Sequence, residues 1–317
     1  MKPKYLFLLF PILLTSCSKS VKPLENKIFC FDTMINIKLF EGEQSDIDEL
    51  NNLFSIFSKL SDNYVSTDIT NIYTLNHTNE EVTVTKELYD LLKCSFDVKN
   101  KGATNYNPLC GSLSNKWKES LKNQQILAEN VKNEELLKIS SSSVVLGNDN
   151  KIQRLGEAEI DLGGIAKGYA LDQAKNYLVS KGYKNYLIDG GSSSILLGEK
   201  NSKDGLFSVG IKDLSNSYLK LKNCFVSSSS ISEQDVVIDN VKYSHIVNPI
   251  TGSVVNENDA VIVVSDKGYY GDAMSTSLMM NTIDEIKTLE AEHDFKAIVI
   301  KNNQIAYCNE GLEVFHR

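Results

Sequence analysis

The chain has 317 residues, of which 42% are hydrophobic, and a formal net charge of −8. This composition supports a substantial folded core and excludes wholesale disorder. The acidic balance, with no basic stripe, argues against a nucleic-acid partner, and it means that an anionic ligand would need a metal ion or local donors to offset repulsion.

The N-terminal segment reads as a signal for export and lipid attachment. Lys2 and Lys4 precede a short apolar run, 5–14, that is too short for a bilayer span of about 20 residues. Leu14-Thr15-Ser16-Cys17 looks like a lipobox, whose cysteine is acylated and becomes the mature N-terminus. We therefore expect a lipoprotein signal peptide over 1–16, a lipidated Cys17 with a polar tether over 17–27, and one folded domain over 28–317. A simple signal peptide with an incidental cysteine is the alternative.

The other cysteines are widely spaced, and none forms a C-x-x-C pair or a cluster with histidine. This spacing argues against a zinc site, and their odd number argues against a dense disulfide framework. We expect them to be small buried apolar residues. They are Cys30, Cys94, Cys110, Cys224 and Cys308.

The first half of the chain alternates between patterned and polar segments. Imperfect alternation predicts a strand over 28–40, and helical spacing predicts a helix from an N-cap at Ser45 to Leu60. Residues 61–79 read as a loop, and a second helix is expected from Thr85 to Phe96. The glycine- and proline-containing segment 102–117 reads as a structured loop, and the polar segment 118–150 as surface.

The second half carries more strand signals. A helix is expected over 165–178, ended by Gly182, and further helices over 271–280 and 282–292. Strands are expected over 186–188, 193–197, 206–211, 224–228, 236–246 (folded at Asp239-Asn240), 260–264 (buried), 297–300 and 305–308, the last two joined at Asn302-Asn303. Because these strands outnumber the helices and join mostly by hairpins, we expect an α+β fold with a largely antiparallel sheet and flanking helices.

One segment combines glycines with a lysine: Ile160-Asp161-Leu162-Gly163-Gly164-Ile165-Ala166-Lys167-Gly168. A strand end that runs through glycines into a helix lets the backbone approach a ligand, and the helix start offers N–H groups to a phosphate. Lys167 adds a full positive charge there. The pattern is neither a P-loop nor G-x-G-x-x-G, and a glycine turn with a surface lysine is an equal alternative.

A carboxylate and a hydroxyl share a helix face in Gly271-Asp272-Ala273-Met274-Ser275-Thr276. The spacing of four residues places the oxygens of Asp272 and Thr276 side by side. These oxygens suit a hard cation such as Mg²⁺, which keeps waters and shares phosphate oxygens. The alternative is an acid in the first turn of a helix beside a buried threonine.

His245 is a candidate general base. It is one of four histidines, and it lies where Tyr243-Ser244-His245-Ile246 passes from a strand to a turn with Pro249 and Gly252. Functional groups are often presented at such places, and an imidazole with a pKa near 6.5 suits proton transfer. A hydrogen-bonded histidine at a strand end is the alternative. A serine hydrolase fits less well, because the chain has no G-x-S-x-G and Ser227 to Ser230 form only a serine run.

Taken in order, these segments resemble the ApbE family of FAD:protein FMN transferases over roughly residues 28–310. Asp161 to Gly168 resembles the family's most specific motif, Tyr186 to Gly191 the segment that follows it, and Tyr243 to Ile246 with Thr251-Gly252 the Y-S-H-I motif. Asp272-Ala273-x-x-Thr276 resembles D-A-x-x-T. Phe31 to Met34, Tyr64, and Tyr106-Asn107-Pro108 with Gly111 and Trp117 resemble earlier elements.

The resemblance implies roles for individual residues. Met34, Tyr64, Asn105, Tyr106, Asn107, Asp161, Lys167 and Ile246 would contact FAD, and Asp272, Thr276 and the carbonyl of Gly164 would hold Mg²⁺ or Mn²⁺. Three positions depart from the family pattern: Asn107 and Asn248 stand where aspartate is usual, and Asp32 where glycine is usual. The two asparagines remove charge but keep hydrogen-bonding capacity.

The resemblance also implies an activity and a location. The family implies a T-fold-related α+β architecture that transfers FMN from FAD to a threonine or serine hydroxyl of an acceptor protein, with release of AMP. His245 would take the proton of the hydroxyl, with Asp272 as metal ligand. Acceptors would be redox proteins of the membrane or surface, and the chain would sit on the outer side of a bacterial cell membrane, held only by its lipid. An FAD pyrophosphatase and a non-catalytic FAD-binding lipoprotein are the alternatives.

Overall fold

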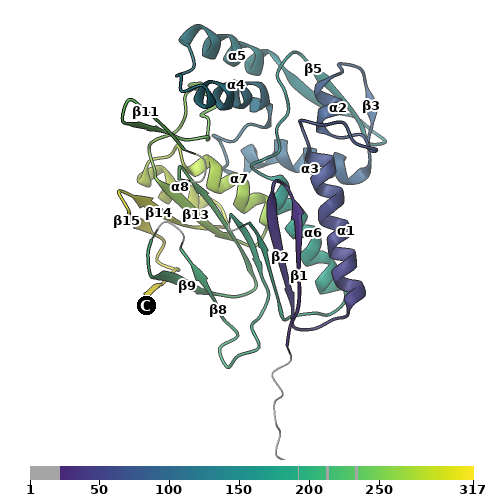
Figure 1. Cartoon of the computed structure of the whole chain (residues 1–317), viewed down its shortest axis with the longest axis vertical. Helices are drawn as coiled ribbons and strands as arrows, with labels where there is room; N and C mark the ends of the chain where they lie inside the picture. The colour runs from purple at the N-terminus through teal and green to yellow at the C-terminus, as the bar shows by residue number, and fades with distance from the viewer. Residues whose placement is uncertain (1–21, 192, 212–213, 233–234) are drawn as a thin grey trace, which may run out of the picture.

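The computed structural model describes residues 22–191, 193–211, 214–232 and 235–317, so the expected signal peptide, Cys17 and the first part of the tether lie outside the described residues. Its centre is an eight-stranded sheet in which every pair of neighbours is antiparallel (Figure 1). In spatial order the strands are β1 (Leu24–Cys30), β2 (Thr33–Leu39), β6 (Tyr186–Gly190), β7 (Ser194–Leu197), β10 (Cys224–Ser230), β13 (Ala260–Ser265), β14 (Lys296–Lys301) and β15 (Gln304–Cys308).

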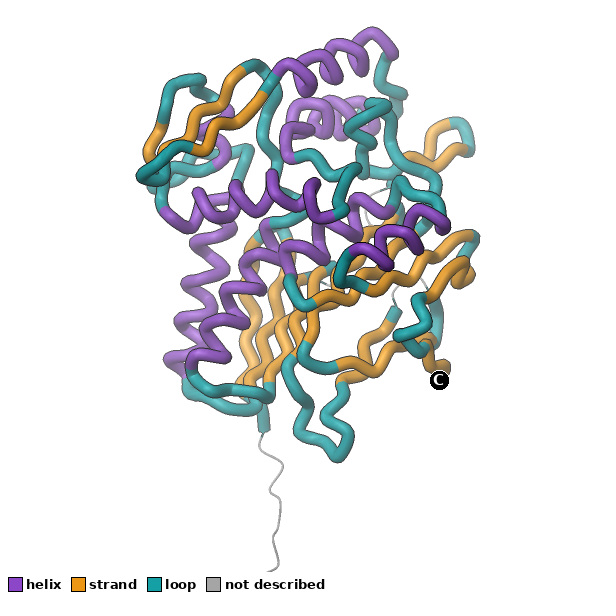
Figure 2. The backbone as a smooth tube through the Cα atoms, turned by 180° about the vertical axis from the view of Figure 1, so that it is seen from behind, coloured by secondary structure: helices purple, strands orange, loops and turns teal. Residues whose placement is uncertain are grey.

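A layer of helices covers one face of this sheet (Figure 2). It contains α1 (Gln44–Ser61), α6 (Ala166–Ser180), α7 (Gly268–Leu278) and α8 (Ile283–Glu292). Their apolar faces are buried against the strands, as Phe54, Leu171 and Met274 show. Burial of side chains of this size stabilises each contact by roughly 1.5–3 kcal/mol, so the helix layer supplies much of the driving force for folding.

The opposite face of the sheet packs on a small three-stranded sheet, made of β16 (Val314–His316), β9 (Ser217–Leu221) and β8 (Phe207–Gly210). Alternate residues of β13 therefore enter different cores: Val261 and Val263 join the helix side, while Ile262 joins the cluster around Phe207. A strand buried on both faces needs apolar residues at every position, which confirms the expected buried strand.

A further group of elements lies at one end of the molecule, at the top of Figure 1. It contains α2 (Ile72–Asn76), α3 (Lys86–Asp97), the 3₁₀ helices η1 (Val98–Lys101) and η2 (Pro108–Cys110), α4 (Gly111–Lys122) and α5 (Glu129–Ser141), with a sheet of β3 (Val82–Thr83), β5 (Lys151–Leu155) and β4 (Ser143–Leu146). The hairpin of β11 (Val236–Ile238) and β12 (Val241–Tyr243) completes the described elements. The α+β class and the antiparallel sheet are thus confirmed.

The N-terminal strand prediction was wrong, because residues 28–40 form parts of a hairpin. The chain reverses at Phe31-Asp32, where φ is +53° and +55°, and Cys30 faces Thr33 across the turn. Such angles are those of a two-residue hairpin turn. Phenylalanine is unusual at the first position of such a turn, so the sequence does not predict the turn. Because β1 begins at Leu24, residues 24–27 belong to the domain and not to the tether.

Three other expectations for the first half need correction. The first helix has its N-cap at Glu43, whose N–H donates to Asp46, and not at Ser45. The expected loop over 61–79 contains the short helix α2, and the expected loop over 102–117 contains the start of α4, with Trp117 buried. The polar segment 118–150 is not all surface, because α5 buries Glu135 and Ile139. Tertiary packing overrides the polar composition in these short elements.

The second half agrees more closely with the prediction. The hairpin angles at Asp239-Asn240 and Asn302-Asn303 are all positive φ, and Gly182 follows α6 with φ +80°. The helix over 271–280 begins a turn earlier, at Gly268, and the strand over 236–246 ends at Tyr243. All five expected cysteines are free; Cys30, Cys110 and Cys224 are buried as expected, whereas Cys94 and Cys308 are only half-buried. In the part of the chain that the structure describes, every helix is too short or too polar to cross a bilayer.

Candidate functional site

The site begins where helices α6 and α7 cross. A Cβ atom on Gly168 would lie 2.2 Å from the carbonyl oxygen of Gly268, and one on Gly268 would lie 2.3 Å from the carbonyl oxygen of Gly168. Only glycine lets the two backbones approach so closely. The crossing places the Asp272 carboxylate against α6, where it accepts a hydrogen bond of 2.7 Å from the N–H of Gly168.

Asp272 is a buried carboxylate held by hydroxyl groups. Its Oδ1 accepts hydrogen bonds from Ser194 on β7, at 2.8 Å, and from Ser227 on β10, at 2.6 Å. Burial raises the pKa of Asp272, while Lys167 and the hydrogen bonds of Ser227, Ser194 and Gly168 act in the opposite direction. Asp272 lies in the second turn of α7. It is therefore not in the first turn of the helix, as the alternative interpretation had it.

Further oxygen atoms lie one turn along α7. Thr276 Oγ1 is 3.3 Å from Ser229 Oγ, and Ser229 Oγ is 3.0 Å from Ser275 Oγ. Gly164 faces this group, since a Cβ atom there would lie 3.4 Å from Thr276 Oγ1. The structure thus brings together Asp272, Thr276 and Gly164, the three expected metal ligands.

This donor set fits a hard cation that shares its ligands with a phosphate. Among the described residues, no three His, Cys, Asp or Glu side chains gather into a metal cage. One carboxylate with neutral oxygens is what Mg²⁺ uses when waters and substrate phosphates complete its shell. Three of the roughly four acceptor positions of Asp272 are taken by hydrogen bonds, which leaves one for a cation.

Lys167 supplies the positive charge of the site. It lies in the first turn of α6, as expected, and its ammonium group acts on Asp272 through charge. The neighbouring backbone N–H groups already donate hydrogen bonds within the protein. The N–H of Gly168 donates to Asp272, and the N–H of Ala166 donates to the carbonyl of Leu162. The side chain of Lys167, more than these helix N–H groups, is therefore free to meet an anion.

His245 lies in a loop that is fixed from both sides. Ser244 is fully buried and donates to the carbonyl of Val255 at 2.9 Å. The indole of Trp117 on α4 donates to the carbonyl of Gly252 at 2.7 Å. These contacts hold a half-buried His245 at the wall of the cavity. An imidazole in the lining of a cavity can accept a proton from a bound hydroxyl.

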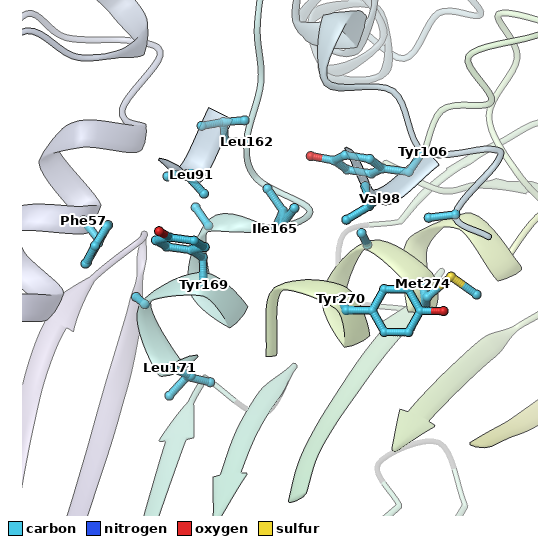
Figure 3. Close-up of a cluster of buried hydrophobic side chains, with 14 of the residues drawn as sticks. Phe57, Leu91, Val98, Tyr106, Leu162, Ile165, Tyr169, Leu171, Tyr270 and Met274 are labelled. Carbon is cyan, nitrogen blue, oxygen red and sulfur yellow. The ribbon is translucent and has the colours of Figure 1, made fainter. Parts of the chain in front are cut away.

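These groups line one cavity of about 310 Å³. Ile165, Tyr169 and Met274, which belong to α6 and α7 or lie next to them, are part of the hydrophobic core (Figure 3). The predicted site residues that line it are Asn105, Tyr106, Asn107, Asp161, Gly164, Lys167, His245, Ile246, Asp272 and Thr276. A cavity of this volume is at the lower end of small-molecule sites, so a ligand as large as a dinucleotide would extend past its mouth.

Two predicted residues lie outside the cavity lining. Met34 is 43% exposed and faces Phe29 across the β1–β2 hairpin. Tyr64 is 53% exposed, and its hydroxyl accepts a hydrogen bond of 2.8 Å from Lys118, which does line the cavity. Both could meet only the part of a ligand that leaves the cavity. Cys17 falls outside the described residues.

The departures from the family pattern have local explanations. Asn107 Oδ1 accepts from the N–H of Leu109, and Asn248 Oδ1 accepts from the N–H groups of Ile250 and Thr251. Asparagine and aspartate perform this turn-capping role equally well. Asp32 has φ +55°, a conformation that glycine favours and aspartate tolerates. All three residues therefore suit the local backbone conformation of this chain.

Sequence reasoning missed the serine residues that line the cavity. Ser193 and Ser194 come from β7 and its approach, and Ser228 and Ser229 from β10. The only signal was a run of serines inside an otherwise apolar strand. Sequence reasoning also missed three residues that line the cavity at or next to α4, which are Cys110, Ser114 and Lys118.

The fold and cavity define an α+β protein whose cavity joins carboxylate and hydroxyl oxygens with a lysine at a helix start. The chain belongs to the ApbE family, whose sequence model matches residues 31–299.

Relatives named FAD:protein FMN transferase align with most of the chain. The protein of Treponema pallidum is 25% identical over 62% of this chain and 60% of its own length, that of Klebsiella pneumoniae 26% over 73% and 74%, and that of Chlamydia trachomatis 24% over 86% and 89%. The chain thus spans somewhat less than two thirds of the Treponema protein.

Solved structures show the same fold. The ApbE protein of Thermotoga maritima superposes with a TM-score of 0.76 at 21% identity, covering 93% of this chain and 97% of that one. The flavin transferase ApbE of Vibrio cholerae superposes with a TM-score of 0.73 at 20% identity, covering 91% and 97%.

Proposed function

We propose that this protein transfers FMN from FAD to a threonine or serine hydroxyl of an acceptor protein and releases AMP. Family membership and the names of its relatives support flavin transfer. The observation that carries the proposal is the meeting of Asp272, Thr276, Lys167 and His245 in one cavity. They come from α6, α7 and the loop after β12, so only the fold unites them.

Asp272, Thr276 and the carbonyl of Gly164 would hold Mg²⁺, or Mn²⁺, which accepts similar oxygen ligands. When bound, the cation supplies neutralisation of the diphosphate oxygens and stabilises the departing AMP. The hydroxyls of Ser194 and Ser227 keep the Asp272 carboxylate in one orientation. Together with the N–H of Gly168 they occupy three of its acceptor positions, and Asp272 lines the cavity.

The side chains of the cavity account for the remaining steps. Lys167 binds the diphosphate as a counter-charge, and His245 accepts the proton of the acceptor hydroxyl. The hydroxyl oxygen then forms a bond to the flavin-side phosphorus, while the bond from that phosphorus to the AMP oxygen breaks. Positioning and charge stabilisation supply most of the rate increase in reactions of this type.

The test uses the chain from Ser18 onward with FAD, Mg²⁺ and an acceptor of a related FAD:protein FMN transferase. After a denaturing gel, we expect flavin fluorescence on the acceptor band. EDTA should abolish it, and Asp272→Ala should reduce it at least about 100-fold, because the charge stabilisation at the phosphorus is lost. Thermal unfolding of the variant serves as the control for folding.

Other products would identify other activities of the same cavity. Free FMN and AMP with a dark acceptor would identify an FAD pyrophosphatase, in which water replaces the hydroxyl. Intact FAD, bound but not cleaved, would identify a binding protein. Transfer by Asp272→Ala at the wild-type rate would exclude the metal role of this residue.

We further propose that the protein is attached to the outer side of a bacterial cell membrane through a lipid on Cys17 and meets redox proteins there. The support is the charged start, the apolar run 5–14 and the lipobox pattern. In a bacterial host, Cys17→Ser should lose metabolic labelling with palmitate and leave the membrane fraction. Labelling that survives the substitution would exclude this site of attachment.

A further inference from the structure

Lys118 on α4 lines the cavity, and neither the sequence nor the proposed reaction gives it a role. Its ammonium group donates a hydrogen bond of 2.8 Å to the hydroxyl of Tyr64, which lies outside the lining. Desolvation lowers the pKa of Lys118, but the bond with Tyr64 and the charge of Asp161 outweigh this effect and raise the pKa. A charged group of the cavity wall is thus tied to an aromatic ring beside the mouth.

The side chain of Tyr64 is fixed at both of its ends. At the backbone, its N–H donates to Asp62 Oδ1 at 2.8 Å. At the other end, its hydroxyl accepts from Lys118 and donates to Asn115 Oδ1 at 3.3 Å. Lys118 and Asn115 are three residues apart, so they lie on the same face of α4. Asn115 is itself held, because its Nδ2 donates to Glu159 Oε2 at 3.4 Å.

The ring of Tyr64 is nevertheless open to solvent, with 53% of the residue exposed. The ammonium of Lys118 is 5.6 Å from the ring centroid, twice its distance from the hydroxyl. It therefore lies beyond the hydroxyl, at the edge of the ring, and covers neither face. A ring that is half exposed buries too little apolar surface for core packing to explain why it is held so firmly. A fixed ring with an open face is suited to stack on another aromatic ring.

FAD can supply such a ring at this place. Its isoalloxazine and adenine rings lie on opposite sides of the diphosphate, and the cavity of about 310 Å³ is too small to hold both. With the diphosphate near Asp272 and Lys167, one ring must extend past the mouth. Lys118 is part of the cavity wall, so a ring that leaves the cavity on the side of α4 meets Tyr64.

We propose that Lys118 is a positioning residue for FAD, which holds the Tyr64 hydroxyl so that the tyrosine ring is ready to stack on the aromatic ring that leaves the cavity. The inference rests on the proposed function. Tyr64 is one of the residues expected to contact FAD, whereas Lys118 is not, and it acts through Tyr64. Binding then no longer has to order the tyrosine side chain, which saves the entropy that a free side chain would lose.

The test is a double-mutant cycle on the Kd for FAD, measured by calorimetric titration with Mg²⁺ present. Lys118→Met removes the donor and keeps the stem, and Tyr64→Phe removes the acceptor and keeps the ring. We expect each variant to raise the Kd about two- to tenfold, which is the effect of ordering one side chain. Because both variants break the same bond, Lys118→Met should add nothing in a chain that already carries Tyr64→Phe.

Titrations with FMN and with ADP identify the ring. Each of these ligands carries phosphate and one of the two rings. Lys118→Met should weaken the binding of only one of them, and that ligand contains the ring that stacks on Tyr64. An equal loss for both would mean that Lys118 binds the phosphate directly, as Lys167 is proposed to do, and would overturn the inference.

Lys122→Met is the matched control, because Lys122 is exposed on the same helix and does not line the cavity. It should leave the Kd for FAD unchanged. Both lysine variants should change the Tm of the ligand-free protein by less than about 2 °C, since exposed charged contacts contribute little to stability.

Two other results would overturn the inference. Additive effects of Lys118→Met and Tyr64→Phe would mean that Lys118 does not act through Tyr64, and an unchanged Kd for FAD in Lys118→Met would mean that it does not prepare the site. Wild-type protein that fails to bind FAD would overturn the proposed function as well, whereas FAD binding that Lys118→Met leaves intact would overturn only the inference.

Discussion

Two buried carboxylates hold helix starts in opposite electrostatic settings. Asp46 accepts hydrogen bonds from the N–H of Glu43 and the hydroxyls of Tyr177 and Tyr183. Asp172 on α6 accepts from the N–H of Tyr269 at the start of α7. Asp46 has many hydrogen-bond donors around it and Asp172 has few. Ionisation of Asp46 should therefore stabilise the fold, and ionisation of Asp172 should destabilise it.

For Asp172, burial raises the pKa from 3.8 to about 6, although the N–H groups of Tyr269 and Gly268 act against it. The folded protein holds this proton more tightly than the unfolded chain, so this contribution to stability falls as pH rises from about 4 to about 6. Asp172→Asn keeps an acceptor and removes the charge, so it should abolish a pH-dependent loss on the order of 2–3 kcal/mol. Urea unfolding at pH values between 4 and 7 measures it, and parallel profiles for variant and wild type would contradict it.

For Asp46, the N–H of Glu43, the two tyrosine hydroxyls and Lys181 lower the pKa from 3.8 to about 2, against the effect of burial. The stabilisation is present above pH 4 and is lost as pH falls toward 2. Asp46→Asn should lower the free energy of unfolding at pH 7 by about 1–3 kcal/mol, because the bonds to a charged group are weakened. The same urea experiment at pH 3 should show a smaller difference; a constant difference at both pH values would refute the explanation.

At the scale of elements, the crossing of α6 and α7 positions the site. The close approach at Gly168 and Gly268 sets the distance between the Asp272 carboxylate and α6, and the strands β7 and β10 bring hydroxyls to the same carboxylate. The geometry of the cavity therefore depends on the packing of four elements that are far apart in the sequence.

Gly168→Ala should separate these helices. Its Cβ would meet the Gly268 carbonyl at 2.2 Å and Asp272 Cγ at 2.8 Å, both of which are fixed atoms. We expect a loss of about 2–3 kcal/mol in unfolding free energy, together with reduced FMN transfer. Gly210→Ala is the matched control, because nothing lies within 4 Å of its Cβ position, and its effect should stay below about 1 kcal/mol. Equal effects of both substitutions would argue against the crossing as the cause.

At the scale of the molecule, one sheet joins both ends of the domain. Its edge strands are β1, near residue 24, and β15, near residue 308, and the cavity draws its lining from segments between residues 105 and 280. Shared cores on both faces of the sheet make separate unfolding of the two halves unfavourable. We expect the domain to behave as one cooperative unit.

Ligand binding should therefore stabilise the whole domain. With Mg²⁺ present, FAD at 100 times its Kd should add about 2.7 kcal/mol to the free energy of unfolding, seen as one transition that moves to higher temperature in differential scanning calorimetry. Removal of the metal with EDTA should reduce this gain, because Asp272 and the diphosphate would repel each other. Two transitions, of which only one responds to FAD, would contradict a single cooperative unit.

The amino-acid sequence by itself determined many of the strands, helices and turns, because periodicity and turn residues act locally. Short-range sequence patterns predict several features of the chain. These are the apolar run at 260–264, the turns at Asp239-Asn240 and Asn302-Asn303, and the glycine segment before Lys167. The reversal at Phe31-Asp32 and the helices α2 and α4 were not, since unusual turn residues and tertiary packing decide them.

The tertiary structure alone decided how the site is assembled. Ser194 and Ser227 meet Asp272 across 78 and 45 residues of sequence, and no local pattern encodes such a meeting. The sequence identified Asp272, Thr276, Lys167 and His245 as candidates, but each had a plausible structural role. The tertiary structure adds that all four line one cavity, where an uncompensated buried charge would be costly and hydroxyl partners are therefore needed.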